Sequence, residues 1–153
     1  LFLEVGREVA KEYPDIEFED RIIDATAMLL AMDPYQFDVL VMENMFGDIL
    51  SDQMAGLVGG LGLAPGGNIG KDVAIFEPVH GSAPDIAEKD IANPTAQLLA
   101  ACMMLEHIGQ PEVATRIRDA IRQTIRKGED LTPDLGGNAS TGKYADALIR
   151  NLG

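Results

Sequence analysis

The sequence predicts an α/β protein. Amphipathic stretches with apolar residues every three or four positions alternate with two short, apolar, β-branched stretches. The order we expect is α, α, β, α, β, α, α, α. With 153 residues, 46% of them hydrophobic, the chain is long and apolar enough for a core. Two strands are too few for an independent sheet, and the chain begins abruptly inside an amphipathic pattern, so we expect a segment of a longer polypeptide.

The first forty residues predict two helices and a strand. Apolar residues recur at every fourth position of residues 1–13, and this helix should end before Pro14. A second amphipathic pattern covers 18–32 and ends before Pro34. The stretch 37–42, Phe-Asp-Val-Leu-Val-Met, is short, apolar and β-branched, which indicates a buried strand.

The middle of the chain is rich in turn-forming residues. A turn at 44–48 should lead into a helix that ends near residue 58. Six of the twelve residues in 59–70 are glycine, and a glycine-rich sequence of this kind predicts a loop. We expect a second strand at 73–76 and a long loop of polar and small residues at 77–94.

The last third of the sequence predicts three helices. Pro94 suits the first turn of a helix that runs to residue 108, and a second helix covers 111–127. Each of these two is followed directly by a glycine, which ends it. After a loop at 131–140, a final amphipathic helix covers 141–152.

Charge and cysteine content exclude several classes of protein. Lys and Arg total 12 and Asp and Glu total 25, so the formal charge is 12 − 25 = −13. Such a surface repels phosphate groups, so we expect neither nucleic acid nor a membrane as partner. The longest apolar run, 98–105, is far shorter than the roughly 20 residues of a membrane span. A single cysteine, Cys102, excludes an internal disulfide and a cysteine-based zinc site, and we expect a cytoplasmic protein.

Three aspartates are candidate metal ligands. Asp48 and Asp52 are four residues apart in an expected helix, so their carboxylates share one face with Cβ atoms about 5–6 Å apart. This pair is either a hard-metal site for Mg²⁺ or Mn²⁺ or a solvated acidic helix start. Asp24 lies in an otherwise apolar run and is either a helix irregularity or a ligand directed at a site elsewhere.

A second candidate site follows the glycine-rich loop. Glycines let backbone N–H groups approach phosphates, but residues 59–70 have neither the Rossmann spacing nor a Walker lysine, so a structural turn is the alternative. His80 is either a base-stacking side chain or a structural loop histidine. Asp85 has the chemistry to accept hydrogen bonds from a ribose diol and would repel a 2′-phosphate.

Taken together, these motifs resemble the β-decarboxylating dehydrogenase family, which comprises isocitrate, 3-isopropylmalate, homoisocitrate and tartrate dehydrogenases. The most specific motifs are Asn-x-x-Gly-Asp-x-x-Ser-Asp and Glu-Pro-Val-His-Gly-Ser-Ala-Pro-Asp. The resemblance covers essentially the whole chain. Its segments are 44–52, 58–70, 76–86, 91–95 and 134–137.

The resemblance implies a metal site shared between two subunits. Asp48 and Asp52 match two ligands of Mg²⁺ or Mn²⁺ from one subunit, and Asp24 matches a third that the partner subunit of a homodimer supplies. The metal would act as a Lewis acid on a small-molecule hydroxy acid during its oxidation and decarboxylation.

The resemblance also implies a cofactor site and its specificity. The adenosine-binding loop matches His80, Gly81, Ser82, Ala83, Pro84, Asp85 and Ile86, together with Asn93, and Glu77 matches its nicotinamide end. Relatives that use NADP have Lys and Tyr in place of Asp85 and Ile86. They also carry Tyr and Arg where this chain has Pro133 and Gly137. The resemblance therefore implies NAD as cofactor.

By the same resemblance the chain is the C-terminal half of a two-domain fold, with helices on a mixed sheet and a cleft between the domains. Residues 1–58 would end the smaller, dimer-forming domain, and 59–153 would end the larger cofactor-binding domain. The catalytic Tyr and Lys would lie upstream of Leu1, so we expect no turnover from this chain alone.

The motifs favour NAD-dependent isocitrate dehydrogenase, which forms 2-oxoglutarate. The alternatives of the same class are 3-isopropylmalate and homoisocitrate dehydrogenases. A different class of reading is a non-catalytic fragment or regulatory module that lacks the N-terminal half.

Overall fold

The computed structural model describes residues 1–152, and they divide into two compact units. The first unit covers residues 1–50, and the second covers the described residues from 51 onward. The division falls inside helix α3 (Asn44–Val58), which is continuous across it. The predicted domain boundary after residue 58 concerns the larger fold and stays a prediction.

The first unit consists of helices joined by extended chain. It contains α1 (Phe2–Ala10), α2 (Ile23–Met32), a 3₁₀ turn η1 (Pro34–Gln36) that packs on α2, and the first half of α3. Helix α1 has no buried residue, whereas α2 buries Thr26 and Leu30. Much of the apolar surface in this unit is therefore exposed to solvent.

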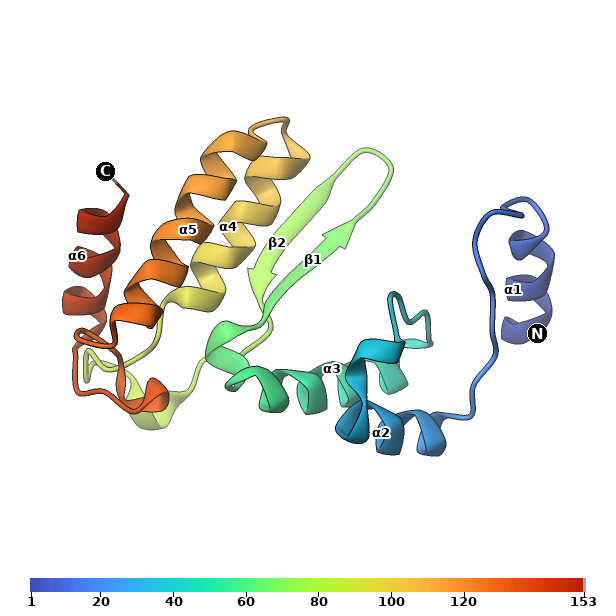
Figure 1. Cartoon of the computed structure of the whole chain (residues 1–153), viewed down its shortest axis with the longest axis horizontal. Helices are drawn as coiled ribbons and strands as arrows, with labels where there is room; N and C mark the ends of the chain where they lie inside the picture. Colours follow the sequence, from blue (N-terminus) through green and yellow to red (C-terminus); the bar gives the residue numbers. More distant parts are fainter. Residues whose placement is uncertain (153) are drawn as a thin grey trace. The chain divides into compact units, whose positions relative to one another are not determined.

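The second unit holds a two-stranded sheet and three long helices (Figure 1). Strands β1 (Pro65–Ile69) and β2 (Ala74–Pro78) form an antiparallel hairpin. Helix α4 (Thr95–His107) packs on both strands and on α5 (Pro111–Lys127), which in turn packs on α6 (Thr141–Asn151). The unit therefore has the layered α/β arrangement that the sequence predicts, with a small sheet.

The core of the second unit lies between α4, α5 and α6. Its buried members are Ala120, Ile121, Tyr144 and Leu148, and leucines from α4 and from the segment before α6 pack around them. Among the described residues, no helix is long and apolar enough to cross a membrane.

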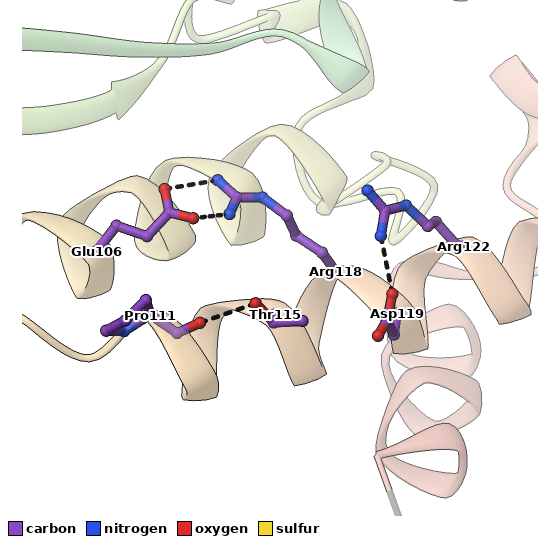
Figure 2. Close-up of polar contacts among 6 residues, drawn as sticks. All are labelled: Glu106, Pro111, Thr115, Arg118, Asp119 and Arg122. Atoms are coloured by element: carbon purple, nitrogen blue, oxygen red, sulfur yellow. Dashed lines mark hydrogen bonds and ion pairs between the residues drawn. The ribbon is translucent and has the colours of Figure 1, made fainter.

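An ion pair joins α4 to α5 (Figure 2). Both terminal nitrogens of the Arg118 guanidinium donate to the Glu106 carboxylate, and the Nη2–Oε2 distance is 3.0 Å. This paired geometry is the strongest form of an Arg–carboxylate contact. The hydrogen bonds from Arg118 lower the pKa of Glu106.

The predicted strand at 37–42 is wrong for this structure. Residues 37–42 carry no strand, and Val39 and Val41 are 82% and 79% exposed. A strand needs a neighbouring strand to satisfy its backbone N–H and C=O groups. In residues 1–152 the only strands are β1 and β2, which pair with each other. The apolar pattern of 37–42 therefore has no partner in this part of the chain.

Other elements also differ from the sequence prediction, and α1, for instance, ends at Ala10 rather than just before Pro14. The glycine-rich stretch predicted as a loop contains β1, because pairing with β2 and packing against α4 override its low strand propensity. At Gly67 a Cβ atom would lie 3.2 Å from Met103 Cε and 3.3 Å from Phe76 Cδ1, so glycine suits this close packing. Helix α2 begins at Ile23 rather than at residue 18, since Ile22 is extended.

A buried hydroxyl pair joins α4 to α6 and gives the fold a testable pH dependence. Tyr144 Oη and Thr95 Oγ1 lie 2.7 Å apart, and both residues are fully buried. Burial raises the pKa of Tyr144, and the nearby Asp134 carboxylate raises it further, although the Thr95 hydrogen bond opposes this. The folded state thus holds the tyrosine proton more tightly than the unfolded state.

We therefore expect the free energy of unfolding to fall as the pH rises above about 10, where the unfolded tyrosine ionises first. Tyr144→Phe should remove this part of the slope and, at pH 8, cost about 1–2 kcal/mol because Thr95 loses its partner. Adding Thr95→Val should recover part of that loss. Urea unfolding at pH 8 and 10.5 measures both effects, and equal pH slopes for the parent and Tyr144→Phe would contradict the assignment.

Candidate functional site

A cavity of about 600 Å³ lies within the second unit. Its volume is in the range of small-molecule and cofactor sites. Four segments of the chain line it: the start of η2 (Leu61–Leu63), the loop from 80 to 93, η4 (Pro133–Leu135) and the start of α6. The lining residues are Leu61, Gly62, His80, Gly81, Ser82, Ala83, Ile86, Ala87, Glu88, Asp90, Ile91, Ala92, Asn93, Asp134 and Thr141.

The cavity brings together most of the predicted cofactor-binding residues. The members that line it are His80, Gly81, Ser82, Ala83, Ile86 and Asn93. Glu77, Pro84 and Asp85 are outside the lining. Glu77 lies on β2, where Asn68 Nδ2 donates to its Oε1 at 3.5 Å, and Asp85 is exposed in the short turn η3 (Pro84–Ile86). The roles assigned to these three residues stay predictions.

The loop that forms one wall of the cavity has a strained backbone. Ala83, Glu88 and Asp90 have φ angles of 44°, 62° and 53°, in the left-handed region that residues with a Cβ rarely adopt. Such residues persist only where surrounding contacts hold them, and they concentrate at functional sites. The loop therefore requires an anchor elsewhere in the fold.

The start of α6 supplies that anchor. Thr141 N–H donates to the Asp90 carbonyl at 2.9 Å, and Thr141 Oγ1 donates to the Ala92 carbonyl at 2.6 Å. Gly142 N–H lies 3.3 Å from Asp90 Oδ1, which accepts its hydrogen bond. These contacts join residues about 50 positions apart, so the wall of the cavity keeps its shape only while α6 is in place.

Asn93 is held by both ends of its side-chain amide. Its Nδ2 donates to Asp134 Oδ2 at 2.9 Å, and its Oδ1 accepts from Thr95 N–H at 3.0 Å. Asn93 is 9% exposed, and its bond with Thr95 is buried, whereas the bond with the exposed Asp134 is partly buried. At Gly62 a Cβ atom would lie 3.1 Å from Asp134 Oδ2 and 3.3 Å from Asn93 Cβ. Glycine at position 62 thus makes room for the pair.

The charged side chains of the cavity are mainly acidic. Among the lining residues are Glu88, Asp90 and Asp134 but neither Lys nor Arg. The one lining residue with a basic side chain is His80, whose Nδ1 lies 3.0 Å from the Gly81 carbonyl oxygen. If Nδ1 donates to that oxygen, Nε2 is an acceptor in the neutral ring. The cavity therefore suits an uncharged, donor-bearing group and disfavours an added phosphate.

The backbone around Gly137 leaves no room for a side chain, so no cationic side chain can extend from this position toward a ligand. A Cβ atom at Gly137 would lie 2.0 Å from the Leu131 carbonyl oxygen, a separation that no real side chain allows. Pro133, the other position predicted to lack a cation, is exposed in η4. The backbone at 137 thus excludes every side chain, whatever its charge.

The predicted metal ligands lie on two helices. Asp48 and Asp52 are both exposed and one turn apart on α3, and Asn44 Nδ2 lies 3.5 Å from Asp48 Oδ2. Asp24 is exposed in the first turn of α2, where its Oδ1 accepts from Ala25 N–H at 2.7 Å. Across residues 1–152, no three His, Cys, Asp or Glu side chains gather as a metal-binding group.

The donor chemistry at Asp48 and Asp52 nevertheless fits Mg²⁺ or Mn²⁺. Both side chains offer hard carboxylate oxygens, and Mg²⁺ is commonly held by one or two carboxylates plus water and substrate oxygens. The chain on its own supplies this pair and no third ligand beside it within its described part. The metal assignments of Asp24, Asp48 and Asp52 stay predictions.

Several lining residues carried no sequence signal for the cavity. Gly62 read as part of a loop, and Thr141 as the first residue of a helix. Asp134 belonged to a stretch that resembles a known family, but nothing in its spacing placed it beside Asn93, 41 residues earlier. Only the folded chain brings these three residues to one cavity.

Comparison with known proteins gives consistent matches. Residues 1–148 match the family described as isocitrate/isopropylmalate dehydrogenase. The chain is 60% identical over 152 residues to 3-isopropylmalate dehydrogenase of Archaeoglobus fulgidus, covering 99% of this chain and 46% of that protein. It is 54% identical over 153 residues to the human mitochondrial isocitrate dehydrogenase [NAD] subunit alpha, covering 99% of this chain and 42% of that protein.

Solved structures agree with the sequence matches. The crystal structure of isocitrate dehydrogenase from Methylococcus capsulatus superposes with a TM-score of 0.95 at 58% identity. The match covers 99% of this chain and 45% of that one. The chain therefore spans about half the length of the relatives it matches.

Proposed function

Since the chain belongs to the isocitrate/isopropylmalate dehydrogenase family, we propose that it supplies the adenosine-binding part of the cofactor site and two of the metal ligands of an NAD-dependent β-decarboxylating dehydrogenase. The family membership and the α/β fold confirm the resemblance read from the motifs. The proposed activity goes beyond family membership, because the relatives are about twice as long as this chain and their activity belongs to the whole length.

The main observation that supports the proposal is the cavity that His80 and Asn93 help to line. It has the volume of a cofactor site and a fixed amide in its wall. In the proposed complex, His80 packs against the adenine base and Asn93 forms hydrogen bonds with its edge. Asp85 accepts from the ribose hydroxyls, and the backbone of 81–84 lies along the phosphates.

The acidic lining supports NAD over NADP. A 2′-phosphate beside the lining carboxylates Glu88 and Asp90 would meet like charges, with no Lys or Arg in the cavity lining to offset them. Asp85, which is exposed outside the lining, would add to this repulsion in the proposed complex. Juxtaposed like charges cost several kcal/mol, which corresponds to a preference of at least about 100-fold. The human relative carries NAD in its name, in keeping with this preference.

Asp48 and Asp52 hold the divalent cation in the proposed function. When bound, Mg²⁺ or Mn²⁺ supplies Lewis-acid chemistry at the oxygens of the hydroxy acid. The two carboxylates orient the cation, and we propose that Asp24 completes the site in the partner subunit of a homodimer. The first turn of α2, where Asp24 lies exposed, is in keeping with a ligand directed at another chain.

We propose isocitrate as the substrate, with 3-isopropylmalate or homoisocitrate as the alternatives. The relatives named above include both an isopropylmalate and an isocitrate enzyme at similar identity, so their names alone do not choose. The residues that contact the substrate's distinguishing group are expected upstream of Leu1.

The test is a chimera in which this chain replaces the matching segment of the solved relative. We expect NADH formation with isocitrate and Mg²⁺, and none from the 153-residue chain alone. A correctly folded chimera that binds Mn²⁺ but neither NAD nor any of the three substrates would favour the non-catalytic reading.

A charge substitution tests the cofactor preference separately. In the chimera, Asp85→Lys should raise the ratio of kcat/KM for NADP to that for NAD by about tenfold or more, because it replaces a repelling charge by an attracting one. Asp72→Lys makes the same charge change in the turn between β1 and β2 and should leave the ratio unchanged. An equal ratio in the parent and both variants would remove Asp85 from the site.

A further inference from the structure

Asp134 is the one cavity carboxylate that hydrogen-bonds another polar side chain of the wall. Its Oδ2 accepts from Asn93 Nδ2 at 2.9 Å, across 41 residues of sequence. Thr95 N–H occupies one lone pair of Asn93 Oδ1 from the opposite side. The two bonds use one amide proton and one lone pair of Asn93, and they leave one of each.

These bonds fix which way the Asn93 amide faces. A flipped amide would direct its NH₂ group at Thr95 N–H and its oxygen at the Asp134 carboxylate, so both contacts would become repulsive. The remaining N–H and lone pair are thus held as a donor and an acceptor in a fixed order. A pair of this kind matches the donor and acceptor on one edge of adenine.

The approach of the pair depends on Gly62. A methyl group there would press on Asp134 Oδ2 at 3.1 Å and on Asn93 Cβ at 3.3 Å. Gly62, Asn93 and Asp134 all line the cavity, so the arrangement lies in its wall rather than behind it.

We propose that Asp134 is a positioning residue that orients the Asn93 amide and so makes the cavity select adenine over hypoxanthine. This proposal rests on the proposed function. Hypoxanthine places an acceptor where adenine has its amino donor. Loss of the Asp134 acceptor would let the amide rotate and serve either base. The selectivity follows from an acceptor at position 134 and not from its charge.

Three variants separate these effects, with AMP and IMP as probes in calorimetric titrations of the 153-residue chain and of the chimera. We expect the parent to prefer AMP, and Asp134→Ala to lose about three- to tenfold of that preference. Asp134→Asn retains an acceptor oxygen and should keep the preference. Gly62→Ala should displace the pair and behave like Asp134→Ala, without removing any polar group.

The controls and outcomes are distinct. Asp146→Ala removes an exposed carboxylate of α6 outside the cavity lining and should bind AMP and IMP as the parent does. If the parent binds AMP and both Asp134→Ala and Gly62→Ala keep its AMP:IMP ratio, the positioning role is overturned while the proposed function stands. If the parent binds neither nucleotide in either form, both are overturned.

Discussion

Replacing both Asp48 and Asp52 by Asn should abolish Mn²⁺ binding by the chimera. Each substitution keeps the shape of the side chain but removes a negative charge, and losing one member of a charge pair at a binding site costs about 2–5 kcal/mol. Two such losses correspond to a decrease in affinity of at least about 1,000-fold. Electron paramagnetic resonance of free Mn²⁺ measures the affinity directly, and turnover with isocitrate should fall in parallel.

A matched pair of substitutions controls for charge alone. Asp33→Asn with Asp38→Asn removes two exposed carboxylates of the first unit that lie outside α3. This variant should bind Mn²⁺ as the parent does. If the Asp48/Asp52 double variant binds Mn²⁺ as tightly as the parent, the acidic face of α3 is a solvated helix surface and the metal assignment fails.

Substitution of Gly137 by Ala should strongly destabilise the second unit. The added Cβ would lie 2.0 Å from the Leu131 carbonyl oxygen and 2.7 Å from Leu131 Cβ, so the backbone must move. Because Leu131 packs on the buried core, the strain would reach α5 and α6. We expect a loss of at least about 3 kcal/mol in the free energy of unfolding, at the upper end of overpacking effects.

The preceding residue provides the control. Gly136 has a φ of 82°, but a Cβ atom there would meet nothing within 4 Å. Gly136→Ala should therefore cost only the left-handed strain of about 1–2 kcal/mol. Urea unfolding of both variants separates a steric from a conformational requirement, and equal losses would contradict the close contact at Gly137.

Local signals explain which elements the sequence predicts well. Helix α5 has the predicted bounds, Pro111–Lys127, because Pro111 fits its first turn and Gly128 adopts a left-handed φ of 72° at its end. The strand at 37–42 fails because its pattern specifies burial but not the neighbour that would pair with it. Strand β1 was missed for the converse reason, since β2 and α4 impose an extended backbone on a glycine-rich sequence.

The residues of the candidate site likewise form two groups, one that the sequence predicts and one that it does not. Residues from His80 to Ile86 and Asn93 were predicted through contiguous motifs that resemble a family. Gly62, Asp134 and Thr141 join them through contacts between distant segments, and no periodicity or spacing carries that information. Asp85 is exposed outside the cavity lining, whereas its neighbours Ala83 and Ile86 line the cavity, and its cofactor-binding role stays a prediction.

The most direct test of the central claim is a crystal structure of the chimera with NAD. We expect adenine in the cavity of about 600 Å³, packed against His80 with hydrogen bonds to the Asn93 amide. Adenine bound elsewhere, with no cofactor atom within contact of His80 or Asn93, would contradict it.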